Sequence, residues 1–117
     1  MENLFKQIVA WHLETFPDIV AEKQKEKLDE ERQEFAIATT PQEKLDELAD
    51  VYIVNAGLSR FYPEESMQNI IQIRKDLQSL NFTFFVLKGA VEKKLEENKK
   101  RTWHIAGGEY PHVGDAQ

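Results

Sequence analysis

The chain has 117 residues, a formal net charge of −6 and no cysteine, with 41% hydrophobic and 31% charged residues. This length fits a single domain, and the lack of cysteine excludes disulfides and thiolate metal sites. The acidic balance argues against a nucleic-acid partner, and the lack of a signal peptide or an apolar span of about 20 residues predicts a cytoplasmic protein with no membrane partner.

Two helices are predicted in the first forty residues. Apolar residues follow helical spacing from Leu4 to His12, and the pattern breaks at residues 15–18. A second helix is expected from about residue 18 to residue 38.

The start of a third helix carries the clearest local signals. Thr40 is placed to cap it, Pro41 suits the first helical position, and Glu43 falls where a capping box needs it. Such a cap contributes about 1 kcal/mol by satisfying backbone amides. We expect this helix to run to about Tyr62, with Pro63 stopping it.

Two further helices are predicted by the spacing of apolar residues, over about residues 64–80 and 82–101. Ser79 or Asn81 is the expected cap of the last one. Almost nothing alternates as a strand does. The predicted fold class is therefore all-α, a helical bundle of about five helices over residues 1–103. Residues 104–117, which include three glycines, are expected to form an irregular tail.

The acidic excess lies between residues 18 and 50, which hold eleven acidic and five basic residues. Carboxylates gather there on the second and third predicted helices: Glu30, Glu31 and Glu34, then Asp46, Glu47 and Asp50. Residues three apart share a helix face, so Glu31 projects with Glu34, and Glu47 with Asp50. Both pairs border positions that are to be buried, where a carboxylate needs a cation or strong hydrogen-bond donors.

Four carboxylates on two antiparallel helices offer only oxygen ligands. That donor set suits Mg²⁺, with Mn²⁺ as a possible substitute, holding phosphate oxygens. The alternative is a solvated helix face on which Glu30, Glu31 and Glu34 pair with Lys27 or Arg32. One Glu-x-x-Glu pair favours this alternative, whereas two pairs on facing helices leave both interpretations open.

Lys94, Asn98 and Arg101 form one stripe on the last predicted helix, because they are spaced i, i+4 and i+7. The two cations and the amide suit the phosphates of a nucleotide. The alternative is that cations simply favour the negative end of a helix. Trp11 is a weaker candidate for stacking on a base, since tryptophan more often belongs to a core or an interface.

Together these motifs resemble the MazG-like family of nucleoside triphosphate pyrophosphohydrolases. Residues 27–35 and 46–51 are similar to its paired E-E-x-x-E and E-x-x-D signature, at a typical interval. Residues 94–103 resemble its closing K-x-x-x-N-x-x-R motif, and residues 11–17 resemble the lead-in of its short members. The resemblance covers about residues 4–103. Asp29 and Arg32 stand where small or apolar residues are commoner.

The resemblance implies a helical domain assembled as a dimer or a dimer of dimers. It implies Mg²⁺ bound by Glu31, Glu34, Glu47 and Asp50, with Glu30 as a supporting residue. The implied reaction converts a nucleoside or deoxynucleoside triphosphate to the monophosphate and pyrophosphate, as in house-cleaning of nucleotide pools. Glu34 or Glu47 is the expected catalytic group that orients the water. Hydrolysis of dUTP or phosphoribosyl-ATP, and a non-catalytic helical dimerisation module, remain the alternatives.

A homo-oligomer is also expected from the apolar residues themselves. The third predicted helix is apolar nearly all round after Asp50, and the last one begins with five large apolar side chains within six residues. A monomer of this length has little interior to cover both, and large apolar patches usually mark interfaces.

Overall fold

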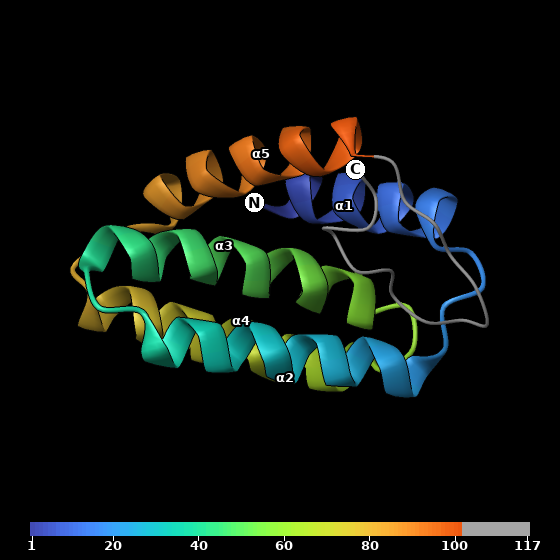
Figure 1. The fold of residues 1–117 in the computed structure, drawn as a ribbon, viewed down its shortest axis with the longest axis horizontal. Coiled ribbons are helices and arrows are strands. Elements are labelled where there is room, and N and C mark those ends of the chain that lie inside the picture. Colours follow the sequence, from blue (N-terminus) through green and yellow to red (C-terminus); the bar gives the residue numbers. More distant parts are fainter. Residues whose placement is uncertain (102–117) are drawn as a thin grey trace.

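The computed structural model describes residues 1–101, which form five α-helices and no strand (Figure 1). The helices are α1 Glu2–Thr15, α2 Ala21–Ile37, α3 Pro41–Leu58, α4 Pro63–Ser79 and α5 Phe84–Lys100. The all-α fold is thus confirmed over this range. Trp103 and the expected tail at residues 104–117 lie outside the described residues. Among residues 1–101, no helix combines the length and apolar character that a membrane crossing requires.

Helix α3 is the centre of the bundle, and each of the other four helices packs against it. Helix α2 runs antiparallel to α3, while α5 lies on another side of it (Figure 1). Every residue from Val51 to Leu58 is buried. Contrary to expectation, one chain covers this apolar helix, because four helices surround it, whereas Phe85 at the start of α5 is left 81% exposed.

The start of α3 follows the sequence signals. The Thr40 hydroxyl accepts a hydrogen bond from the Glu43 amide at 3.1 Å, and Pro41 is the first helical residue. The Glu43 carboxylate in turn accepts from the amide and the hydroxyl of Thr39, at 3.2 Å each. These bonds to Thr39 are the main reason that the pKa of Glu43 lies below its ordinary value. They define where α3 begins, and hence which way Glu47 and Asp50 point.

Other helix ends differ from the predictions. Helix α3 ends at Leu58, and Pro63 begins α4 instead of stopping α3. Asn81 does not cap α5 but closes α4, with a left-handed φ of 60°. Its backbone amide donates a hydrogen bond to Gln78 O at 3.1 Å, and the Phe82 amide donates one to Leu77 O at 3.0 Å. This is the pairing of a Schellman motif, in which asparagine can replace glycine.

The cap of α5 is Thr83, whose hydroxyl accepts from the Val86 amide at 3.2 Å. Thr83 has an extended backbone, as Thr40 does at the start of α3. Ser79 is instead the last residue of α4, and its hydroxyl donates to Lys75 O at 3.2 Å. The prediction of Ser79 or Asn81 is therefore wrong, because both residues belong to the end of the preceding helix.

A buried polar network holds α1 and α2 against α3. Gln24 donates from Nε2 to Val54 O at 2.8 Å, and its Oε1 lies 3.0 Å from His12 Nε2. Arg60 donates from Nη1 to His12 Nδ1 at 2.8 Å. Because a guanidinium only donates, Nδ1 is an acceptor and the hydrogen of a neutral ring is on Nε2. Burial, and then the Arg60 charge, lower the pKa of His12 to about 4.

Gly57 lies against this network and leaves room for it. A Cβ at this position would come within 2.6 Å of Gln24 Nε2 and 2.7 Å of the His12 ring. Glycine is therefore required for the close approach of α1 and α2 to α3.

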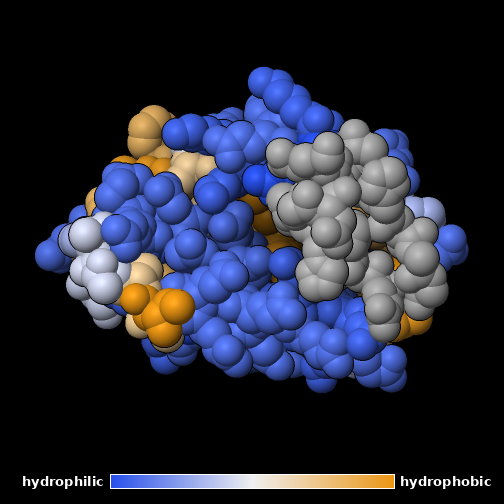
Figure 2. Space-filling model, viewed as in Figure 1, coloured by the Kyte–Doolittle hydropathy of each residue, from blue (hydrophilic) through white to orange (hydrophobic). Residues whose placement is uncertain are grey.

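The face carrying α2, α3 and α5 is mostly hydrophilic, and apolar atoms gather at the end where α2 finishes and α5 begins (Figure 2). Large apolar side chains remain exposed in one chain, most of all at Phe85 (81%), Ile37 (76%) and Met67 (70%). Ile71 and Leu13 are about half exposed. These residues, and not those of α3, are the apolar surface that the described chain leaves uncovered.

Candidate metal centre

Three of the predicted ligands meet between α2 and α3. One carboxylate oxygen from each of Glu31, Glu34 and Glu47 lies within 4.8 Å of the other two. Glu31 and Glu34 are one turn apart on α2, and Glu47 faces them from antiparallel α3. The one-turn spacing on α2 therefore brings Glu31 and Glu34 to Glu47, while Asp50, the fourth predicted ligand, is not in this group.

The burial of these carboxylates is uneven. Glu31 is 7% exposed, Glu47 is half-buried and Glu34 is exposed. Within the described part of the chain, Glu31 Oε2 and Glu47 Oε2 are buried and have no hydrogen-bond partner. A buried acceptor without a partner costs about 1–3 kcal/mol, and more if it is charged. A proton or a cation would each satisfy these two oxygens.

The raised pKa values of Glu31, Glu47 and Asp50 show that little positive charge compensates these carboxylates. Burial, followed by repulsion from Asp50, raises the pKa of Glu31 to about 7, although Lys27 opposes the shift. The same two causes lead the rise of the Glu47 pKa to about 6. Burial also raises the pKa of Asp50, against the effect of Lys94.

A hard divalent cation fits this group. The available donors are carboxylate oxygens, which suit Mg²⁺ or Mn²⁺ and not softer metals. The two oxygens without hydrogen-bond partners come from opposite helices, so a cation between α2 and α3 would satisfy both.

Asp50 and Glu30, the other predicted residues, are each paired with a lysine. Asp50 is half-buried, and its Oδ2 lies 3.4 Å from Lys94 Nζ of α5. Glu30 is exposed, and its Oε2 lies 3.6 Å from Lys27 Nζ. Lys27 also lies 3.4 Å from Glu31 Oε1. The solvated-face interpretation therefore describes Glu30, which belongs to a surface pair, but not the buried Glu31.

The predicted basic stripe lies along α5, which packs on α3. Lys94 reaches the carboxylates through Asp50, and the Arg101 charge lowers the pKa of Asp50 as a smaller effect. Arg101 also donates to Asn98 Oδ1 at 3.1 Å. Trp11 is half-buried and packs edge to face against Phe16, with ring centroids 5.7 Å apart. Its role in binding a base remains a prediction.

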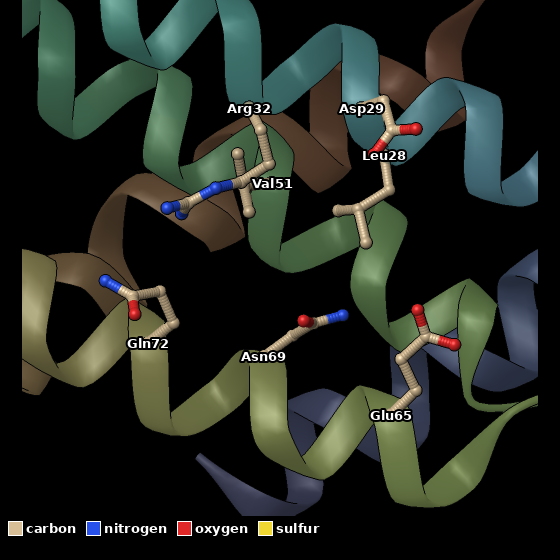
Figure 3. A pocket seen from close by; sticks show the side chains of 7 residues that line it. All are labelled: Leu28, Asp29, Arg32, Val51, Glu65, Asn69 and Gln72. Atoms are coloured by element: carbon tan, nitrogen blue, oxygen red, sulfur yellow. The ribbon is translucent and has the colours of Figure 1, made fainter.

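Arg32, which departs from the family-like pattern, has a structural partner on α4. Its Nη1 donates to Asp76 Oδ2 at 2.8 Å. Together with Asp29 it lines a cavity of about 130 Å³ between α2 and α4, whose floor includes Leu28 and Val51 (Figure 3). Glu65, Asn69 and Gln72 of α4 line the opposite side. Sequence reasoning missed this cavity, because it depends on how α2 and α4 lie over α3.

Comparison of the chain with models of known families, with curated proteins and with solved structures finds no match. Its function is therefore inferred from its own residues.

Proposed function

We propose that this protein is a Mg²⁺-dependent nucleoside triphosphate pyrophosphohydrolase, which converts an NTP or dNTP and water to the monophosphate and pyrophosphate. The observation that carries the proposal is the meeting of Glu31, Glu34 and Glu47 with two buried oxygens that have no hydrogen-bond partner. An acidic face that served only solubility would hold its carboxylates in water, where they need no partner.

The role proposed for each of these residues follows from how deeply its carboxylate is buried. Mg²⁺, when bound, would supply charge neutralisation for the triphosphate and acidify a water molecule. Glu31 and Glu47, with buried oxygens, are the proposed anchors, and Asp50, which pairs with Lys94, is the proposed further ligand beside them. Glu34 is exposed within the same group, so it is the better placed of the two predicted catalytic carboxylates to orient water from the solvent side. Glu47 would then act as a ligand first.

The α5 stripe is the proposed contact for the departing pyrophosphate. Lys94 is 29% exposed and already lies at the carboxylates, so its ammonium can face both Asp50 and a phosphate oxygen. Arg101 and Asn98 follow it along α5 towards the helix end. Positive charge placed where negative charge develops is an established way to lower a barrier.

A substrate panel with product analysis tests the proposal. Canonical and modified NTPs and dNTPs, dUTP included, are incubated with Mg²⁺, and the phosphorus products are identified by ³¹P NMR. The monophosphate and pyrophosphate are expected, while the diphosphate and orthophosphate would rule out cleavage between the α and β phosphates. A chain that turns over none of them, nor phosphoribosyl-ATP, would fit the non-catalytic module instead.

We also propose that the protein works in the cytoplasm as a homo-oligomer, either a dimer or a dimer of dimers. The support comes from the exposed Phe85, Ile37 and Met67 side chains, since the apolar α3 is covered within one chain. Single exposed apolar residues are common and need no explanation, so the proposal requires that these side chains belong to a patch that a second chain covers.

A further inference from the structure

Lys27 lies at the edge of the carboxylate group, although it is no ligand. Its Nζ is 3.4 Å from Glu31 Oε1 and 3.6 Å from Glu30 Oε2, and its side chain is 27% exposed. Of these two carboxylates, the side chain of Glu30 is 65% exposed and that of Glu31 only 9%. The ammonium matters mainly for Glu31, because water can solvate Glu30 but hardly reaches Glu31.

The pairing is asymmetric within the Glu31 carboxylate. Oε1 faces Lys27, while Oε2 is buried and has no hydrogen-bond partner in the described part of the chain. Lys27 therefore compensates one oxygen of the carboxylate and leaves the other without a partner. A divalent cation bound to Glu31 would meet the positive charge of Lys27 at close range.

We propose that Lys27 is a positioning residue. It is the counter-ion of Glu31 in the metal-free protein, and its positive charge weakens the binding of a divalent cation to that carboxylate. This inference rests on the metal site of the proposed function. The physical reason is charge competition, since an ammonium and a divalent cation both draw on the same carboxylate. A single and a double positive charge about 6 Å apart repel enough to change a dissociation constant about tenfold, even at the dielectric constant of water.

Helix α2 offers a matched control. Lys23 lies one turn before Lys27 and pairs with Glu26 at 3.2 Å, with its side chain 36% exposed. Both lysines make i,i+3 pairs on the same helix, and such pairs contribute only a few tenths of a kcal/mol. Lys27 contacts a buried carboxylate of the proposed site, whereas Lys23 pairs with Glu26 on the exposed side of the helix.

The experiment measures Mn²⁺ binding at pH 8 from the electron paramagnetic resonance of free Mn²⁺, for wild type, Lys27→Met, Lys27→Arg and Lys23→Met. Methionine keeps the apolar stem without the charge, and arginine keeps the charge. Lys27→Met is expected to bind Mn²⁺ about tenfold more tightly. The other two variants are expected to stay within twofold of wild type.

Thermal unfolding in EDTA supplies a second readout. The melting temperature of Lys27→Met should fall more than that of Lys23→Met, because Glu31 loses a counter-ion that solvent cannot replace. Three results would each overturn the inference. Lys27→Met could bind Mn²⁺ within twofold of wild type, the two methionine variants could lose equal amounts of melting temperature, or Lys27→Arg could bind Mn²⁺ as tightly as Lys27→Met is expected to. Wild-type protein that binds no Mn²⁺ would instead overturn the metal site itself, so the two failures are distinguishable.

Discussion

Lys94 of α5 lies 3.4 Å from Asp50 of α3, which joins the predicted basic stripe to the predicted acidic site. The two side chains are about a quarter exposed. This contact places a cation beside the carboxylates without the help of a second chain. It also brings together two residues that are 44 positions apart in the sequence.

Replacing Lys94 by methionine should therefore harm turnover far more than stability. Loss of one charged contact in a reaction site typically lowers kcat by about 10²–10³-fold, whereas a partly exposed ion pair contributes at most about 1 kcal/mol. Steady-state kinetics measure kcat, and urea unfolding measures the free energy of unfolding. Lys93→Met is the control, because Lys93 is the exposed neighbour on α5 and should keep wild-type kcat. Equal kinetics for the two variants would contradict the role of Lys94.

Replacing Glu31 by glutamine should abolish turnover while making the metal-free protein more stable. The folded chain forces a charge into a buried place, and glutamine removes that charge with little change of shape. A gain of about 1–3 kcal/mol at pH 8 is expected from the size of the pKa shift. Urea unfolding in EDTA measures it, with Glu30→Gln as the exposed control. A less stable Glu31→Gln protein would show that the anion is well compensated without metal.

The same pair of proteins should differ in how stability depends on pH. In the folded chain the pKa of Glu31 is raised to about 7 from the ordinary 4.5, mainly by burial and then by Asp50. The folded state thus holds the proton more tightly, and the contribution to stability is complete below pH 4.5 and lost as pH rises through 7. Wild type should lose stability against Glu31→Gln over this window.

Urea unfolding in EDTA at pH 5, 6, 7 and 8 checks this dependence. His12 acts in the opposite direction, since its pKa is lowered to about 4 and its contribution is lost as pH falls from 6.5 through 4. It is present in both proteins and so cancels from their difference. A difference that stays constant from pH 5 to pH 8 would mean that Glu31 titrates normally.

Gly57→Ala and Gly89→Ala should have opposite effects on stability. Alanine normally favours a helix over glycine by up to about 1 kcal/mol. At Gly89 a Cβ meets nothing within 4 Å, so a gain of that order is expected. At Gly57 the Cβ would come within 2.7 Å of buried His12 and Gln24, so a loss of about 1–3 kcal/mol is expected. Chemical unfolding measures the change in the free energy of unfolding for both variants. A stabilised Gly57→Ala protein would disprove the close packing of α1 and α2 on α3.

Light scattering at micromolar concentration should give a mass above the 13.7 kDa of one chain. The uncovered Phe85, Met67 and Ile71 side chains are the reason. Phe85→Lys tests the exposed side chain of α5, and the double change Met67→Lys with Ile71→Lys tests those of α4; at least one should reduce the mass. A wild-type monomer with full activity would refute the oligomer.

The sequence by itself determined what depends on neighbours within about four residues. Helical periodicity, the Thr40 cap and the one-turn spacing of Glu31 with Glu34 are local, because hydrogen bonds and faces of a helix are set by positions three or four apart. The local pattern is wrong at Asn81, because it predicts a cap of α5 for a residue whose left-handed backbone ends α4.

The tertiary structure alone decided which groups lose water and which distant groups meet. The local pattern places Glu31 at the edge of the apolar face and Glu30 away from it, but it does not show how far the packing of α3 buries Glu31. Nor does it show that α3 is covered within one chain, or that Lys94 pairs with Asp50. Burial and long-range contact follow from the packing of all five helices together, and the raised pKa values of the carboxylates follow from that burial.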